Sequence, residues 1–463
     1  MSGRDSAVQK KSNDLGNDSV GRLVVRLAVP AIVAQLVNAL YNIVDRIYIG
    51  HIADVGDIAL TGLGLCFPII MFVSALAALV GIGGGSRASI LMGDGDLHGA
   101  NEILGNCAVL MLMISVGSTA LFQLTKEPLL YLFGASGNTI PYALSYLEIY
   151  LWGSIFVQIA LGMNNFITIQ GFSTISMATV LVGAAVNIAL DPIFIFGLNM
   201  GVRGAALATV IAQSVSGAWV IAFLVGKRTK MRLQLVFFRL KRSVILPVVA
   251  LGVSPFIMQS TESLVTISFT SSLYRYGGDV AVGAMTICSS IMQFLCMVFM
   301  GLAQGAQPII GFNYGAGKAD RVKQAFRILI FSSLVYAGCM WGLIMALPQV
   351  FVGLFNSKAE LVEITVWALR IYLACFFLLG IQFSCQQTFV ALGQAKVSLF
   401  LALLRKVILL IPLIFILPQF VGDKVFAVFL AEPVADFLAA AVTGTVFFVQ
   451  LPKILKARAG QSA

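Results

Sequence analysis

The chain has 463 residues, of which 59% are hydrophobic and only 11% are charged, and its formal net charge is +10. Because about one quarter of the residues of a soluble domain are charged, this composition excludes an ordinary soluble protein. The seven Cys lie in apolar segments without paired spacing and the two His lie in expected loops. We therefore expect neither disulfides nor a His-based metal or catalytic centre.

The chain begins with a polar stretch that leads into a long apolar segment without a small-residue cleavage site. We expect residues 1–21 to form a cytoplasmic tail and not a cleavable signal peptide. Apolar runs of about 20 residues span a bilayer as helices. The predicted spans are 22–48, 59–83, 100–124, 142–163, 174–197, 202–225, 243–274, 279–306, 323–348, 361–386, 396–418 and 424–449. The predicted fold class is an all-α integral membrane protein with twelve transmembrane helices.

The second half of the chain repeats the first at an offset of about 222 residues. The matching segments include Leu132-Phe133 with Leu354-Phe355, and Ile149-Tyr150-Leu151 with Ile371-Tyr372-Leu373. Six helices per copy give both copies the same orientation, which predicts two six-helix lobes related as parallel internal repeats, a common transporter plan. The predicted parts are an N-lobe at 22–226, a basic cytoplasmic linker at 227–242, a C-lobe at 243–450 and a cytoplasmic tail at 451–463.

The distribution of Lys and Arg predicts the orientation, because basic residues gather in cytoplasmic segments. With the N-terminus placed inside, 21 basic residues fall in inner segments and six in outer ones. We therefore expect a multi-pass protein of the cytoplasmic (inner) membrane, with the lipid bilayer as a partner and both termini cytoplasmic. Nucleic-acid binding is not expected, because it needs a soluble basic face.

Ionisable side chains inside a membrane are costly and are candidates for function. Six acids fall inside the predicted spans: Asp45, Glu148, Asp191, Glu262, Glu432 and Asp436. For Glu148, Glu432 and Asp436, pairing with a neighbour or a place near the interface is an equally good interpretation. For Asp45 and Asp191, the remaining acids of the first half, the positions along their helices favour a functional role.

Asp45, Asp191 and Thr209 each lie nine residues from a predicted outer turn, which places them at a similar depth of about 13 Å by helical rise. Asn187 lies one helical turn from Asp191 on the same face. Two carboxylates held together in a low dielectric cannot both stay ionised, so one binds a proton or a cation lies between them. Oxygen ligands suit H⁺ or Na⁺. The pattern predicts a coupling-ion site at Asp45, Asn187, Asp191 and Thr209.

The second half lacks this cluster and carries Glu262, Arg370, Arg405 and Lys406 instead. Arg370 is expected to be the buried partner of an acid, either Glu148 or Glu262. Arg405 and Lys406 either extend to the interface or neutralise cavity acids, and their roles, like those of Glu432 and Asp436, stay open. The predicted residues of a substrate cavity or its charge partners are Glu262, Glu148, Arg370, Met163, Met258 and Met292. Pro30 and Pro255 recur in both halves and are either hinges or tolerated kinks.

One stretch resembles a known family. The sequence from Asn187 to Ile195, which contains Asp191-Pro192, together with the sequence from Gly201 to Thr209 and Gln213, is similar to the helix 5–6 signature of multidrug and toxic compound extrusion (MATE) transporters. The Val44-Asp45 pair with Gly50 resembles their first-helix motif. Gly171 and Gly393 fall where that family has a repeated turn. The resemblance covers residues from about 20 to 450.

The resemblance implies a secondary active transporter and not an enzyme, which exports small amphipathic, often cationic compounds by alternating access while H⁺ or Na⁺ moves inward. No cofactor is implied beyond the coupling ion, and we expect a monomer. Asp45, Asn187, Asp191 and Thr209 correspond to the family's N-lobe cation or proton network. Glu262 is similar to the seventh-helix glutamate of one branch, but that branch's helix 10 aspartate is missing near Ile381 or Gln382. The pattern is nearer to the bacterial drug exporters.

Two other functions stay open at this point. A flippase for lipid-linked saccharides in the same superfamily is expected to have a cleft rich in Arg and Lys, and Arg370, Arg405 and Lys406 are compatible with one. A membrane-embedded enzyme or a receptor is the other alternative. An enzyme needs a nucleophile–base or metal constellation, and a receptor needs a substantial soluble domain; the sequence contains neither.

Overall fold

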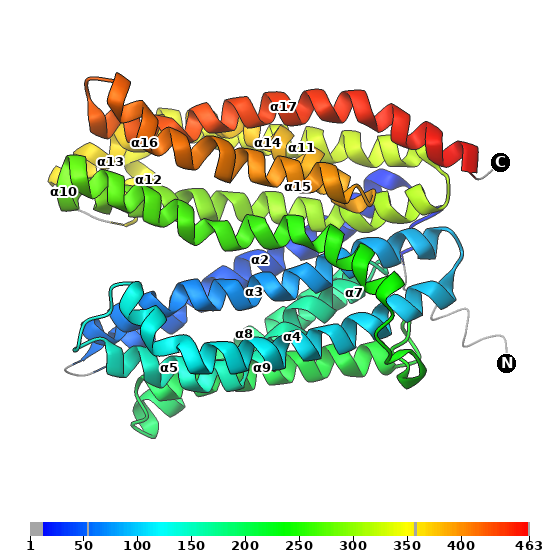
Figure 1. Cartoon of the computed structure of the whole chain (residues 1–463), viewed down its shortest axis with the longest axis horizontal. Coiled ribbons are helices and arrows are strands. Elements are labelled where there is room, and N and C mark those ends of the chain that lie inside the picture. Colours follow the sequence, from blue (N-terminus) through cyan, green and yellow to red (C-terminus); the bar gives the residue numbers. More distant parts are fainter. Residues whose placement is uncertain (1–12, 53–54, 356–358, 462–463) are drawn as a thin grey trace.

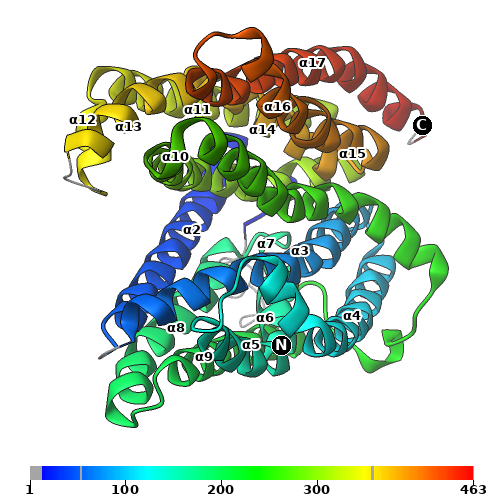
Figure 2. The same ribbon diagram turned by 60° about the vertical axis from the view of Figure 1, so that its left-hand side comes forward.

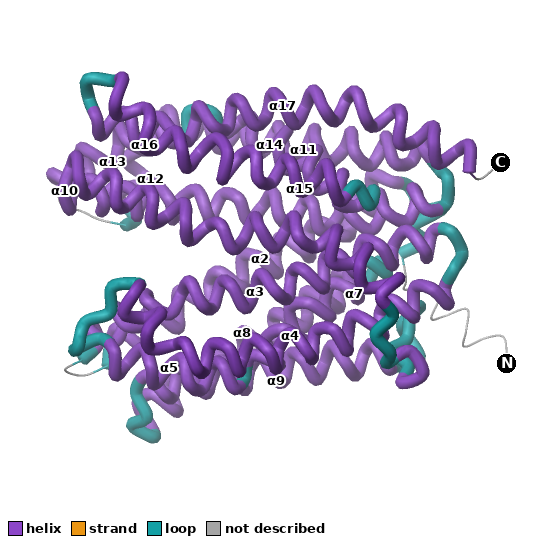
Figure 3. Tube along the Cα trace, in the orientation of Figure 1, coloured by secondary structure: helices purple, strands orange, loops and turns teal. Residues whose placement is uncertain are grey.

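The computed structural model describes residues 13–52, 55–355 and 359–461. Within these residues all the regular structure is helical, as Figure 3 shows, and this agrees with the predicted fold class. The first half contains α2 (Val20–Gly50), α3 (Gly56–Gly93), α4 (Leu97–Leu132), α5 (Ile140–Trp152), α6 (Ser154–Gln158), η1 (Ile159–Met163), α7 (Asn164–Thr168), α8 (Ser173–Pro192), η2 (Ile193–Gly197) and α9 (Val202–Val225). The second half contains η3 (Leu235–Phe237), α10 (Arg242–Gly315), α11 (Ala319–Ala346), α12 (Pro348–Gly353), α13 (Ala359–Tyr372), α14 (Phe376–Ala391), α15 (Ala395–Leu403), η4 (Leu404–Leu410), α16 (Ile411–Phe420) and α17 (Lys424–Gln461).

The described residues contain twelve helical spans. Nine helices are long and apolar enough to cross a membrane, and two bent pairs, Ile140–Trp152 with Ser154–Thr168 and Leu361–Tyr372 with Phe376–Ala391, raise that number to 11. One of the nine, α10, is two spans, because its backbone turns back at Gly278, where φ is 64°. Only glycine adopts such a backbone readily. The prediction of twelve transmembrane helices is confirmed.

The helices form two bundles, seen from two sides in Figures 1 and 2. Helices α3 to α9 pack together in the N-lobe, and α10 to α17 pack together in the C-lobe. Two hydrophobic cores lie mainly in each lobe, because helices that are apolar on most sides bury their larger side chains against one another.

The lobes meet through closely packed glycines that follow the internal repeat. A Cβ atom on Gly83 of α3 would lie 2.2 Å from the carbonyl oxygen of Val248 in α10. The repeat counterpart of Gly83 is Gly305 in α10, where a Cβ atom would lie 2.4 Å from the Cα of Ala28 in α2. Each lobe thus contributes the same two helices to the contact, as expected for two parallel repeats.

Helix α2 belongs to both lobes. Its first turns, with the fully buried Leu23 and Leu27, lie in a core made mainly by α10, α11, α14 and α17 of the C-lobe. Its last turns, with Asp45 and the fully buried Ile49, pack in the N-lobe. Pro30 lies between the turns that pack in the C-lobe core and those that pack in the N-lobe core. The helix therefore connects the N-lobe site directly to the contact between the lobes.

The described chain begins and ends at the same end of the molecule, which we call the terminal end (Figure 1). Here residues 13–18 contact both lobes: Asn13 donates from Nδ2 to the carbonyl oxygen of Gly171, and Arg321 donates to the carbonyl oxygens of Leu15 and Asp18. The ribbons of the two lobes separate toward the opposite end, which we call the open end (Figures 1 and 2).

Candidate functional site

The candidate site in the N-lobe is built from three helices. Asp45 comes from α2, Asn187 and Asp191 from α8, and Thr209 from α9, and α8 packs against both of the other helices. Asp45 is 8% exposed and Asp191 is fully buried, and the two carboxyl groups lie close enough for their charges to interact. The structure therefore brings the four predicted residues together.

Asn187 is the centre of this group. Its Nδ2 donates to Asp191 Oδ1 at 3.4 Å and to Thr209 Oγ1 at 3.5 Å. The spacing of four residues places Asn187 and Asp191 on one face of α8, one turn apart. The amide therefore links the acid of its own helix to the hydroxyl of α9.

Three oxygens of this group are buried without a hydrogen-bond partner: Asp45 Oδ1, Asn187 Oδ1 and Asp191 Oδ2. Buried polar atoms in native proteins are nearly always paired, so an unpaired one needs an explanation. Two of these acceptors belong to interacting carboxylates and the third to an amide. Such a set suits a bound cation or a proton, either of which would supply the missing partner. This oxygen set fits the H⁺ or Na⁺ predicted from the sequence.

Two tyrosines and Gln213 also belong to this group, although the sequence did not predict their positions there. The Tyr146 side chain of α5 lies within hydrogen-bonding reach of Thr209 and interacts electrostatically with Asp45. Tyr41 lies one turn before Asp45 on α2 and within hydrogen-bonding reach of Gln213. The four-residue spacing of Tyr41 from Asp45, and of Gln213 from Thr209, is a sequence signal that could have identified these two residues, whereas Tyr146 belongs to another helix.

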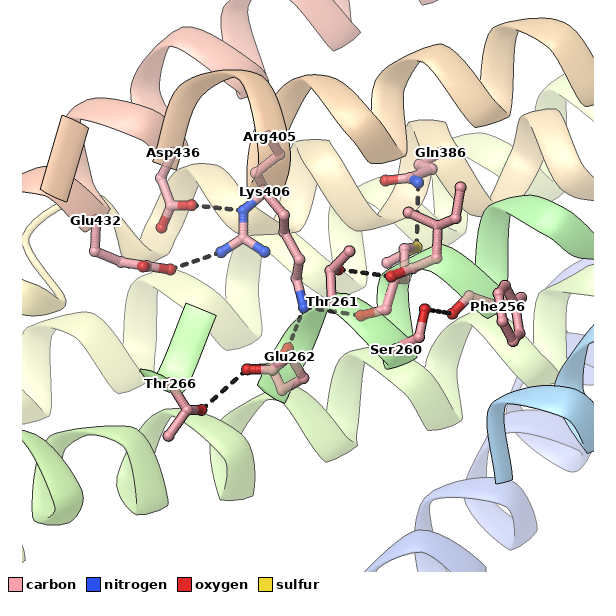
Figure 4. A network of polar contacts seen from close by, with 12 residues as sticks. Phe256, Ser260, Thr261, Glu262, Thr266, Gln386, Arg405, Lys406, Glu432 and Asp436 are labelled. Atoms are coloured by element: carbon pink, nitrogen blue, oxygen red, sulfur yellow. Dashed lines mark hydrogen bonds and ion pairs between the residues drawn. The ribbon is translucent and has the colours of Figure 1, made fainter. Parts of the chain in front are cut away.

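A second polar cluster lies in the C-lobe (Figure 4). Arg405 donates from Nε to Asp436 Oδ1 at 2.7 Å and from Nη2 to Glu432 Oε1 at 2.9 Å. Lys406 pairs with Glu262 and also donates to the carbonyl oxygen of Met258 at 2.9 Å. Both cations belong to η4, a π-helical segment, a conformation that occurs often at functional sites. Arg405 and Lys406 therefore neutralise acids, which was one of the two roles open to them.

The expectation that Arg370 is a buried partner of Glu148 or Glu262 is wrong. Arg370 and Glu148 are both exposed, and Glu262 pairs with Lys406. Arg370 is in the last turn of α13, before the bend of 47°, so its side chain does not enter the bundle. Hydropathy alone gave no sign of this bend.

The predicted cavity methionines lie in different surroundings. Met163 is 1% exposed in the N-lobe core and Met292 is 8% exposed in the C-lobe core, so both pack against neighbours. Met258 borders a small pocket with Gln386, whose Nε2 lies 3.1 Å from its sulfur. Pro30 and Pro255 lie inside α2 and α10, and both helices continue through them. A role for either proline as a hinge stays a prediction.

Comparison with known proteins adds the following. The profile of a family called MatE matches the chain twice, at residues 30–193 and 255–416. The multidrug export protein MepA of Staphylococcus saprophyticus is 26% identical over 424 residues, which cover 91% of this chain and 93% of that protein.

Two solved structures share the fold. One, described as MATE in the bent conformation, has a TM-score of 0.90 and 24% identity and covers 98% of this chain and 99% of that one. The other is described as the outward-facing conformation of a multidrug resistance MATE family transporter of the MOP superfamily. It has a TM-score of 0.89 and 24% identity and covers 96% and 99% of the two chains. The likeness therefore extends over both lobes.

Proposed function

The chain belongs to the MatE family, whose profile matches both of its halves, and we propose that it exports small amphipathic, often cationic compounds in exchange for H⁺ or Na⁺. It is a multi-pass membrane transporter and not an enzyme. The name of the staphylococcal relative supports export of many drugs, but it does not identify the coupling ion.

The observation that carries the proposal is the pair of buried acids in the N-lobe. Asp45 and Asp191 each have a carboxylate oxygen without a partner, and Asn187 adds a third acceptor. An ionised pair of this kind is costly in a low dielectric, so binding of a cation lowers its free energy. A cationic drug and a coupling cation that compete for the same negative charge are coupled in exchange.

The path of α2 supports a mechanism of alternating access. Asp45 is near one end of α2, while Leu23 and Leu27 near the other end are fixed in the C-lobe core. A change of charge at Asp45 therefore acts on a helix that spans both lobes and contains Pro30 where it passes between them. We propose that cation entry moves α2 about Pro30, which lowers drug affinity, and that the cation leaves inward after the lobes reorient.

The orientation and assembly belong to the same proposal. The distribution of Lys and Arg supports a position of both termini on the cytoplasmic side of the inner membrane. The open end would then face outward, and the terminal end would be the closed cytoplasmic side. One chain contains both lobes and the complete N-lobe group, which supports a monomer as the working unit.

Ethidium export tests this function and identifies the ion. Ethidium uptake into inside-out vesicles that contain the wild-type protein should follow an imposed proton gradient or an imposed sodium gradient. Asp191→Asn removes the charge with little change of shape and should abolish the gradient-dependent part. Asp57→Asn, a matched change at an exposed aspartate of α3, should retain it. Transport by Asp191→Asn at the wild-type rate would contradict the assignment.

The flippase alternative loses most of the support that it had from the sequence. Arg405 is paired with two acids and Lys406 with a third, so neither cation is available to a phosphate group without breaking an ion pair. Absence of ethidium transport under both gradients, with folded protein present, would nevertheless favour that function.

A further inference from the structure

The C-lobe cluster carries an unbalanced charge. Its three acids are Glu262, Glu432 and Asp436, and its two cations are Arg405 and Lys406, so the fully ionised cluster has a net charge of −1. Figure 4 shows the Arg405 guanidinium joined to both Glu432 and Asp436, and Lys406 extending to Glu262. The Lys406–Glu262 pair is balanced, so the excess negative charge belongs to the two acids that share one arginine.

These two acids are the most deeply buried part of the cluster. Glu432 is 3% exposed and Asp436 is 2% exposed, and they lie one turn apart on α17. Arg405 donates one hydrogen bond to each of them. Glu432 Oε2 remains buried with no hydrogen-bond partner. An unpaired carboxylate oxygen in a site with excess negative charge is where a proton is most strongly stabilised.

We propose that the Glu432–Asp436 pair binds one exchangeable proton, so that the C-lobe has a proton site separate from the acids of the N-lobe. With that proton the cluster is neutral, and without it a net negative charge remains inside the membrane, which is costly. The two acids titrate as a unit because they share Arg405. The proton comes from water and returns to water, and no bond between heavy atoms changes.

The groups that act on this pair come from three elements and a bend. They are Arg405 and Lys406 of η4, Glu262 and Cys296 of α10, Tyr372 of α13 and Cys375 at the bend before α14. The two cations favour the ionised pair and Glu262 opposes it. Protonation therefore depends on whether Lys406 keeps its contact with Glu262.

A route for the proton leads through the same residues. The Glu262 side chain is 54% exposed, and an ionised side chain at this depth requires water and not lipid around it. A small pocket lies between Lys406, Arg405, Gln382 and Gln386, and its volume of about 10 Å³ is at the lower limit for holding one water molecule. The Lys406–Glu262 ion pair and this pocket thus lie between water at the protein surface and the Arg405 guanidinium, which binds Glu432 and Asp436.

This site is not the repeat counterpart of the N-lobe pair. At the offset of the internal repeat, Glu432 corresponds to Val210 and Asp436 to Ser214, and neither is ionisable. The acids of the two lobes therefore form separate sites. As a part of the transport cycle the C-lobe site rests on the proposed function, but the binding of a proton can be measured without transport.

Infrared spectroscopy of the purified protein in lipid nanodiscs tests the site directly. The Asp45→Asn/Asp191→Asn double variant removes the N-lobe acids and serves as the background. We expect this background to show a carboxylic acid C=O band that shifts in deuterium oxide and disappears reversibly as the pH rises. Glu432→Gln, which mimics the protonated acid, should remove about one carboxyl group per protein from the band. Glu363→Gln, at an exposed glutamate of α13, should leave the band unchanged.

Asp436→Asn serves as the second variant if Glu432→Gln does not fold, and it should remove the same band because the pair titrates together. A band that persists in both variants, or a background that has no titrating band, would overturn the proposal. The number of protons moved per ethidium separates the C-lobe proton site from the proposed export function. This number should fall in Glu432→Gln. Absence of ethidium transport in wild-type protein with an intact band contradicts the function alone, whereas transport without the band contradicts the site alone.

Discussion

At the scale of single residues, the protein holds buried acids in two different ways. In the N-lobe, the described residues contain no ion pair of Asp45 or Asp191, and each acid keeps a carboxylate oxygen without a partner, which suits a mobile cation. In the C-lobe, Glu432 and Asp436 share a fixed cation, Arg405. The first arrangement suits binding and release of a cation, and the second ties the acids to the stability of the fold.

Arg405→Met should therefore be strongly destabilising. Loss of one partner from a buried ion pair leaves uncompensated charge and costs about 3–5 kcal/mol. Thermal unfolding of the purified protein should show a large fall in Tm. Adding Glu432→Gln and Asp436→Asn to this variant removes the unpaired charges and should restore much of the loss. Equal Tm values for Arg405→Met and the wild type would contradict the role of the arginine.

The sequence predicted much of the N-lobe site but not the pairing in the C-lobe. Two features predicted the N-lobe site: the four-residue spacing of Asn187 and Asp191, and the equal distances of Asp45, Asp191 and Thr209 from the outer turns. Both depend only on helical rise and period. The pairing of Lys406 with Glu262 joins residues 144 positions apart, and it depends on the π-helical turn of η4. No periodicity indicates such a turn.

At the scale of elements, the terminal end is closed by backbone contact between α3 and α10. A Cβ atom on Gly252 of α10 would lie 1.8 Å from the carbonyl oxygen of Leu79 in α3, so only glycine fits there. The aromatic rings of Phe72 and Phe256, farther toward the open end, pack edge to face at 5.4 Å. This seam holds the lobes together on the side of the termini.

Gly252→Val should separate the lobes at this seam. Overpacking of a close contact costs about 1–3 kcal/mol, and here the neighbour is backbone, which cannot rotate away. Spin-label distances across the terminal end should lengthen, and ethidium export should fall. Gly338→Val is the matched control, because a Cβ atom at Gly338 of α11 meets nothing within 4 Å. Unchanged distances in Gly252→Val would contradict the closed seam.

The segment 13–18 should depend on Arg321 for its position. Arg321 donates to the carbonyl oxygen of Asp18 at 2.6 Å, to that of Leu15 at 3.2 Å and to Asn313 Oδ1 at 2.9 Å. Hydrogen bonds from a charged donor contribute about 1.5–3 kcal/mol each.

Hydrogen–deuterium exchange in residues 13–18 should therefore be at least tenfold faster in Arg321→Gln than in the wild type. Lys323→Gln breaks only a surface pair with Asp320 and should leave the exchange rate unchanged. If both variants exchange at the wild-type rate, Arg321 does not hold the segment.

At the scale of the whole molecule, two similar bundles contain different buried polar groups. The internal repeat is visible in the packing of Gly83 and Gly305, yet the N-lobe acids and the C-lobe ion pairs have no counterparts in the other copy. Hydropathy and the repeat were sufficient to predict twelve helices in two lobes. The bends at Gly153 and before Phe376 were not predicted, because a hydropathy pattern is the same for a straight helix and a bent one.

The central claim is that the N-lobe acids couple cation entry to drug export. The most direct measurement records ethidium and ion movement together in proteoliposomes, with an imposed proton or sodium gradient, for wild type, Asp191→Asn and Asp57→Asn. We predict opposite and linked fluxes in wild type and Asp57→Asn, and loss of both fluxes in folded Asp191→Asn. Linked fluxes that persist in Asp191→Asn, or ethidium movement in the wild type that is independent of the proton and sodium gradients, would contradict this account.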